Sequence, residues 1–403
     1  MSSRRRAQAI LSVVAVALLT LPALLMAPSA ALPNGQPSWG PWRTERVEAN
    51  GRGLTHTGLA FGPGDVPHII YPGTSPADFG AAWYAYRSGL NWERVYLEQY
   101  GSPGDIAVDA AGRAHMVYRG DPGIRYATYH QGVLAKETVD PGVAAQDMAI
   151  TLDASGVPHV AYVASSTTVK HGYRDPATGT WALQTILKLP AGGSNAEIAF
   201  ALDSAGRPHI AYDVRSNTNP GTWYVTRTAT GIWVSEELGP DCEYSAGLAL
   251  DSQDRPHIVC SHEQRGLYYV TRPTSLGAWA YERVDAGFRH GTEPDIVLDR
   301  QDRPHIAYAH GYNPGWPDDP TRPGQLHYAT RTAAGTWAIE LVDPVGQYNG
   351  IGPSIALDSW GLPHISYILG WHRFSEGALD PVLERRDILY AEPVVATGLG
   401  LMP

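Results

Sequence analysis

Short apolar runs separated by turn residues recur along the chain. In one copy, the run Asp295 to Leu298 leads into Asp299 and a tight turn, and Pro304 to Tyr308 then forms a second run rich in β-branched and aromatic residues. A third run, Leu326 to Arg331, alternates as a strand should, and Trp337 to Val342 returns after a turn that contains glycine. Runs of this kind, bounded by turn residues, predict four short antiparallel strands.

The unit occurs seven times. Each copy places a histidine at the start of its second run, at positions 68, 115, 159, 209, 257, 305 and 364, so the spacing is 44 to 59 residues. Four strands in a repeat of roughly this length match the size of a propeller blade. The sequence therefore predicts an all-β fold, a seven-bladed β-propeller with four-stranded antiparallel blades and almost no helix.

The two ends of the repeat region complement each other. The last unit has strands at 354–358, 363–367 and 388–391 but no fourth strand led by Trp, whereas Trp42 to Val47 precedes the first full unit. An open ring would leave two unpaired sheet edges, which favour aggregation. We expect the N-terminal strand to pair into the last blade and close the ring.

The first residues differ from the repeats. Arg4, Arg5 and Arg6 precede an apolar run from Ala9 to Met26, and small residues follow up to Ala31. This order is typical of a secretory signal peptide, although about 18 apolar residues could also span a bilayer as an anchor. We expect cleavage after residue 31, export to the periplasm or the extracellular space, and a single propeller domain over residues 32–403.

Net charge narrows the classes of partner. Residues 1–31 contain three Arg and no acidic residue, so their removal changes the formal net charge from −10 to −13. Binding to nucleic acid or to anionic lipid requires a basic surface. We therefore expect neither nucleic acid nor a membrane as a partner of the mature chain, and we expect a monomer.

The two cysteines, Cys242 and Cys260, fall in the same blade. Cys242 precedes the first strand of that blade and Cys260 lies near the end of its second strand, so both belong to one face of the ring. Export favours a disulfide, yet the hairpin register does not place the two residues directly opposite each other. A Cys242–Cys260 bridge and two free thiols are both compatible with the sequence.

Several polar and aromatic residues recur in nearly every unit. The seven His open the second strands, and an Asp ends the first strand in six units, with Gly62 in the first. Trp residues that open most fourth strands and Arg residues that end most third strands recur in the same way. Catalytic groups are usually unique, so this repetition indicates structural roles, with each imidazole bonded to the Asp or to backbone and each Trp packed between blades.

The turns before the fourth-strand Trp residues carry a family resemblance. Asp175 to Trp181, Thr230 to Trp233, Leu276 to Trp279 and Ala334 to Trp337 resemble degenerate Asp-boxes, the turn motif of bacterial neuraminidase repeats. On these turns the mature chain is similar to sialidase-like propeller proteins, and the resemblance implies a sugar ligand. Sialidases need an Arg cluster, a Tyr activated by Glu and an acid/base Asp, which no motif here identifies; a polysaccharide lyase is the other enzyme to consider.

Two long loops are predicted on one face of the ring. The second-to-third loops are longest in the sixth and seventh units, Ala309 to Gln325 and Leu369 to Asp387, and loops on a rigid scaffold often carry function. They combine aromatic rings, which stack on sugars, with charged groups for hydroxyls or a carboxylate; ordinary solvated insertions are the alternative. The candidate ligand-binding residues are Tyr312, Trp316, Asp318, Asp319, Arg322, Trp371, His372, Arg373 and Glu376.

Four carboxylates occupy equivalent positions at the starts of first strands. These residues are Asp105, Asp147, Glu197 and Asp295. First strands line the central channel of a propeller, so the four side chains would ring its mouth. Oxygen ligands suit Ca²⁺, and the sequence admits either a calcium site or a water-filled channel without metal.

The sequence thus predicts an exported propeller that binds an extracellular glycan on a loop face. A carbohydrate-active enzyme, with a lyase ahead of a sialidase, is the alternative. A scaffold for an extracellular protein partner suits the same fold.

Overall fold

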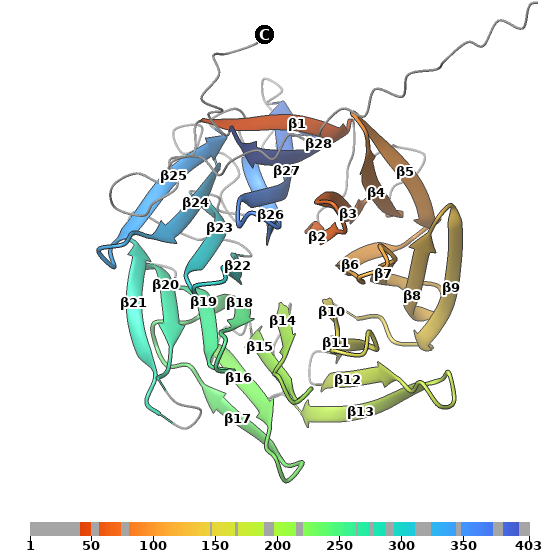
Figure 1. Cartoon of the computed structure of the whole chain (residues 1–403), viewed down its shortest axis with the longest axis horizontal. Coiled ribbons are helices and arrows are strands. Elements are labelled where there is room, and N and C mark those ends of the chain that lie inside the picture. Colours follow the sequence, from red (N-terminus) through yellow and green to blue (C-terminus); the bar gives the residue numbers. More distant parts are fainter. Residues whose placement is uncertain are drawn as a thin grey trace, which may run out of the picture.

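In the computed structural model, the described residues are 41–49, 56–73, 80–145, 147–165, 168–188, 197–214, 221–262, 265–273, 277–286, 294–310, 324–343, 348–373 and 382–394. Across these ranges the chain forms seven four-stranded antiparallel sheets and no helix. It follows that no helix in the described residues is long and apolar enough to cross a membrane. The sheets are arranged around a central axis (Figure 1), so the predicted seven-bladed propeller is confirmed.

The strands are grouped below by their position within a blade, and each group runs from the first blade to the seventh. The first strands, nearest the axis in Figure 1, are β2 (Gly58–Gly62), β6 (Ser102–Val108), β10 (Met148–Leu152), β14 (Ile198–Leu202), β18 (Tyr244–Leu250), β22 (Asp295–Leu298) and β26 (Tyr348–Leu357). The second strands are β3 (Val66–Pro72), β7 (Ala114–Gly120), β11 (Pro158–Ser165), β15 (Pro208–Val214), β19 (Pro256–His262), β23 (Pro304–His310) and β27 (Pro363–Arg373). The third strands are β4 (Ala82–Ser88), β8 (Gly123–His130), β12 (Thr168–Arg174), β16 (Gly221–Arg227), β20 (Gly266–Thr271), β24 (Gln325–Arg331) and β28 (Val382–Pro393). The outermost strands are β5 (Asn91–Glu98), β9 (Val133–Asp140), β13 (Trp181–Lys188), β17 (Trp233–Glu237), β21 (Ala280–Asp285), β25 (Trp337–Asp343) and, in the seventh blade, β1 (Trp42–Glu48).

The seventh blade is built from both ends of the chain. Strand β1 pairs antiparallel with β28, from Trp42 opposite Pro393 to Glu48 opposite Ile388. One more bond, from the amide of Val394 to the carbonyl of Pro41 at 3.0 Å, extends the pairing. The predicted closure of the ring by the N-terminal strand is confirmed (Figure 1).

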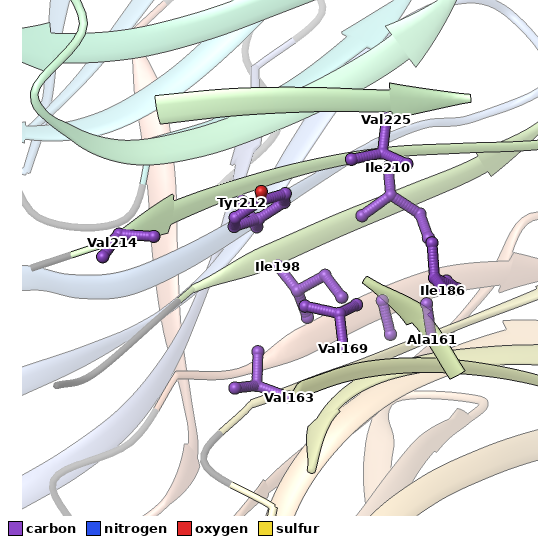
Figure 2. Packing of buried hydrophobic residues seen from close by; sticks show 10 residues of the cluster. Ala161, Val163, Val169, Ile186, Ile198, Ile210, Tyr212, Val214 and Val225 are labelled. Atoms are coloured by element: carbon purple, nitrogen blue, oxygen red, sulfur yellow. The ribbon is translucent and has the colours of Figure 1, made fainter. Parts of the chain in front are cut away.

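The hydrophobic core lies between blades. Each strand turns alternate side chains to opposite faces of its sheet, so both faces of a blade are apolar and each packs on a neighbour. Between the third and fourth blades, for example, Val163, Val169 and Ile186 meet Ile210 and Tyr212 (Figure 2). The same kind of cluster recurs at the other interfaces.

The seventh blade differs from its predicted outline. The segment Leu369 to Asp387 was expected to be a long loop, but β27 and β28 extend well into it. Trp371 pairs with Arg385 and Arg373 with Val382. The expected loop is therefore wrong over most of its length, because the two strands continue to pair past the edge of the ring, and only 374–381 separate them.

The two cysteines are joined. Cys242 and Cys260 form a disulfide with 5.3 Å between their Cα atoms, and both are fully buried. Cys260 faces Ala246 across the hairpin, and Cys242 lies beyond a bulge in that pairing. The cysteines bridge despite not being opposite each other, because the bulge brings the entering loop over the second strand.

Candidate functional site

The repeated histidines hold the strands of a blade together. In six blades the Nε2 atom lies 3.2 to 3.7 Å from a carboxylate oxygen of the Asp after the first strand. The Nδ1 atom accepts the hydroxyl proton of a third-strand tyrosine in most blades, as Tyr126 donates to His115 at 2.6 Å. Burial lowers the pKa of His68 to about 4, which fits a neutral ring. The structural role predicted for these histidines is confirmed.

A second repeated arrangement joins neighbouring blades. The indole nitrogen of Trp181 donates to the Glu137 carboxylate at 3.0 Å, and Arg174 Nε donates to the same oxygen at 2.8 Å. Glu137 belongs to the second blade, whereas Trp181 and Arg174 belong to the third. The Trp181 ring also packs edge-on against Tyr126, with 5.3 Å between centroids. We call this Trp, Arg and Glu arrangement the interblade clamp.

The interblade clamp accounts for most of the repeated Trp and Arg residues. Arg272 and Trp279 hold Glu236 in the same way, at 2.9 and 3.2 Å. Arg87 with Glu45 and Arg331 with Glu282 form further pairs. The predicted packing of these Trp residues between blades is therefore confirmed. These Arg residues have a structural role as well, because each pairs with a Glu of the preceding blade.

The four predicted carboxylates line one cavity on the axis of the ring. This cavity has a volume of about 170 Å³, and its lining also includes His56 and Ser354. Three of the four carboxylates reach the first strand of the next blade. Asp105, Asp147 and Asp295 accept amide protons from Ile150, Ile198 and Ile355 at 3.1, 2.8 and 2.9 Å.

Burial shifts the pKa of two of these carboxyls upward. It raises the pKa of Asp105 to about 6, even though the amides of Ile150 and Ile106 act in the opposite direction. Burial also raises the pKa of Asp295. Among the described residues, no group of three or more His, Cys, Asp or Glu side chains is arranged to hold a metal ion. The bonds that these carboxylates make tie the first strands of neighbouring blades together.

Two further pockets lie at successive blade interfaces. The first, of about 310 Å³ between the second and third blades, is lined by His115, Tyr126, Glu137 and Arg174 among others. The second, of about 590 Å³ between the third and fourth blades, is lined by the residues at the matching positions, including His159, His171, Gln184 and Arg227. Both are bordered by first-to-second turns, so they open on the face opposite to the second-to-third loops.

The second pocket differs from the first at a few positions. His171 stands where Tyr126 stands in the first pocket, and its Nε2 donates to His159 Nδ1 at 3.2 Å. Val157 takes the place of Arg113. Shorter side chains at both positions leave more room, and burial lowers the pKa of His171 to about 3, so its ring is neutral. Tyr173 stacks on His159 with 5.6 Å between centroids and remains 39% exposed.

The structure does not test the predicted ligand-binding residues. Tyr312, Trp316, Asp318, Asp319, Arg322 and Glu376 lie outside the described residues. Trp371, His372 and Arg373 belong to the backbone of β27, and their side chains lie outside the described part of the structure.

Sequence reasoning missed the interblade pockets. Each pocket takes its walls from two different blades, so no single motif contains it. The available signal was an exception within the repeat: the aromatic position of the third strand is occupied by His171, and the acidic position of the fourth strand by Gln184.

Comparisons with known proteins bear on the fold. No protein family matches the sequence, and no curated protein does. Among solved structures, a streptogramin B lyase matches with a TM-score of 0.54 and 12% identity over 89% of this chain and 100% of that chain. A lectin from Burkholderia pseudomallei matches with a TM-score of 0.54 and 13% identity over 79% and 97%. A virginiamycin B lyase from Staphylococcus aureus matches with a TM-score of 0.50 and 12% identity over 86% and 99%.

These likenesses show a propeller fold. The neighbours named above are a lectin and two lyases, and at 12 to 13% identity they show the fold alone. At this level of identity the sialidase-type repeat family expected from the Asp-box-like turns is not assigned by the comparisons, which support the generic propeller alone.

Proposed function

We propose that this protein is exported and binds an extracellular carbohydrate in pockets between neighbouring blades. The observation that carries the proposal is the recurrence of one pocket type at two successive interfaces, with matching residues on its walls. Repeated shallow pockets are what a multivalent sugar-binding protein needs, because several weak sites on one rigid ring raise the overall affinity.

The chemistry of the walls supports a sugar ligand. Each pocket offers an aromatic or imidazole ring beside groups that can donate or accept hydrogen bonds, such as Tyr173 and Gln184 in the larger one. Small-ligand sites typically combine an apolar surface with a few well-placed polar groups, in a volume of roughly 300 to 1,000 Å³. Both pockets have volumes in this range.

A glycan array with residues 32–403 tests the proposal. We expect binding to a defined set of glycans, and we expect Tyr173→Ala to weaken it because this change removes a stacking surface. Every glycan that binds is then incubated with the protein and checked for cleavage. Turnover would replace the binding function by an enzymatic one, and silence across the array would overturn the proposal in favour of a protein partner.

A further inference from the structure

An arginine without a counter-ion distinguishes the pocket between the third and fourth blades. At four interfaces the Arg that follows or ends the third strand pairs with a Glu of the preceding blade: Arg87 with Glu45, Arg174 with Glu137, Arg272 with Glu236 and Arg331 with Glu282. At the interface of the third and fourth blades the Arg is Arg227, and the residue at the Glu position is Gln184. The guanidinium is retained while its carboxylate partner is replaced by a neutral amide.

The contacts of Arg227 leave its charge unneutralised. Its Nε donates to the carbonyl of Gly231 at 3.2 Å, and its guanidinium lies 6.0 Å from the centre of the Trp233 ring. Among the described residues, no carboxylate lies within ion-pair distance of Arg227. A guanidinium presents five donors in a planar fork that matches a carboxylate, so this group is available to an anion.

Gln184 supplies a second free donor on the same lining. Its Nε2 atom is buried and has no hydrogen-bond partner among the described residues. A buried donor without a partner costs free energy because it has lost its hydrogen bond to water. A ligand oxygen that accepts from Nε2 would recover this free energy, and a Glu at this position would have had no proton to donate.

The rest of the lining suits the remainder of a sugar. Tyr173 lines the pocket and is 39% exposed, so part of its ring is open to a ligand. Asp153 is the acidic residue of the lining; its Oδ1 accepts from the amides of Ser155 and Val157 at 2.8 and 2.9 Å, and Oδ2 lies 3.7 Å from His159 Nε2. Its remaining lone pairs can accept from sugar hydroxyls.

We propose that the pocket between the third and fourth blades is selective for an acidic sugar, a hexuronate whose carboxylate takes the place of the missing Glu beside Arg227 and Gln184. The inference rests on the proposed carbohydrate-binding function and adds the ligand class and the pocket. The neighbouring pocket, in which Glu137 already neutralises Arg174, is expected to lack this preference.

Isothermal titration of residues 32–403 with methyl glucuronide and methyl galacturonide, against methyl glucoside and methyl galactoside, tests the inference. We expect the uronates to bind about 10-fold or more tightly than the neutral sugars, because their carboxylate forms a charge-assisted pair with Arg227. Gln184→Glu supplies the counter-ion found at four other interfaces, so it should remove the preference while raising or preserving the melting temperature. Glu137→Gln is the matched control, since it should create a second acidic-sugar site in the smaller pocket.

The outcomes separate the inference from the function on which it rests. Neutral sugars that bind as tightly as uronates would overturn the inference and leave carbohydrate binding intact. Uronate binding that survives Gln184→Glu would overturn the assignment to this pocket. If neither these sugars nor any glycan on the array binds, the proposed function itself fails, and the inference fails with it.

Discussion

Tyr162 and Tyr71 occupy the same place in their blades, on the second strand three residues after the repeated His. Both side chains are fully buried. The Tyr162 hydroxyl donates to Asp140 of the preceding blade at 2.7 Å, whereas the Tyr71 hydroxyl has no hydrogen-bond partner in the described part of the chain. A Tyr to Phe substitution can therefore be made at equivalent positions with and without the hydrogen bond. The difference in the free energy of unfolding then measures the contribution of one hydrogen bond between blades.

Tyr162→Phe should lower the free energy of unfolding by about 1 to 2 kcal/mol, because the change removes a buried charge-assisted hydrogen bond and leaves no cavity. Asp140 keeps its ion pair with Lys170 at 2.7 Å. Tyr71→Phe, the control, should change stability by less than about 0.5 kcal/mol or slightly increase it. Urea unfolding measures both, and equal losses in the two variants would contradict the role given to the hydroxyl.

Residue patterns explain which of these partners could be predicted. In the six blades that have it, the Asp that meets the repeated His stands six residues before that His, so a fixed spacing revealed the pair. The tyrosine that donates to the same His stands 11 residues later in the second blade and 26 later in the seventh. The loop between second and third strands varies in length, so no fixed spacing exists, and this contact becomes visible only in the folded sheet.

At the scale of elements, pairing between strands was easier to predict than contacts between blades. Turn residues and alternation located the strands, and the missing fourth strand of the last unit located the closure by β1. The interblade pockets depend on which side chain of one sheet faces which side chain of the next. Gln184 and Arg227 are 43 residues apart. The absence of a carboxylate partner for Arg227 is therefore seen only when the two residues are placed at the same interface.

Removal of residues 41–49 should expose the edge of β28 along most of its length. We expect this variant to associate in size-exclusion chromatography and to melt at a lower temperature, since an unpaired edge recruits other strands. A permuted chain that begins at residue 56 and carries residues 41–49 after residue 394 through a short linker is the control. The bond between Val394 and Pro41 shows that these ends already meet, so the permuted chain should elute at the same volume as the parent. A deletion variant that melts at the same temperature and elutes at the same volume as the parent would contradict this role of β1.

For the whole molecule, the repeat shifts the pKa of several buried histidines in the same direction. Burial lowers the pKa of several repeated histidines, to about 4 for His68, and in the same direction for His115, His209 and His257. Unfolded, such residues bind protons near pH 6.5. Because the folded state binds fewer protons, the stability that these groups contribute is present above pH 6.5 and is lost as the pH falls towards 4. The pKa of Asp105 is raised to about 6, so this group makes the folded state more stable as the pH falls. Fewer groups have this effect than have the effect of the histidines.

Thermal unfolding between pH 7 and pH 4 should therefore show a steady fall in melting temperature. The variant His68→Asn keeps a polar group near the Tyr84 hydroxyl and removes one titrating ring. Whatever its stability at pH 7, its melting temperature should fall less steeply with acid than that of the parent. Parallel curves for the two proteins would show that His68 takes up its proton equally in both states and would contradict the assignment.

The closure between β1 and β28 also governs the order in which the molecule can form. A ribosome delivers β1 first and β28 last, so the first strand made waits without its partner while six blades are assembled. Turn contacts such as that from Ser359 to Asp65, 294 positions apart, arise at the same late moment. Contacts this distant in sequence form slowly. A nascent chain that ends before the final hairpin cannot close the ring, so it has unpaired sheet edges. The pairing of β1 with β28 can therefore form only after the final hairpin has been made.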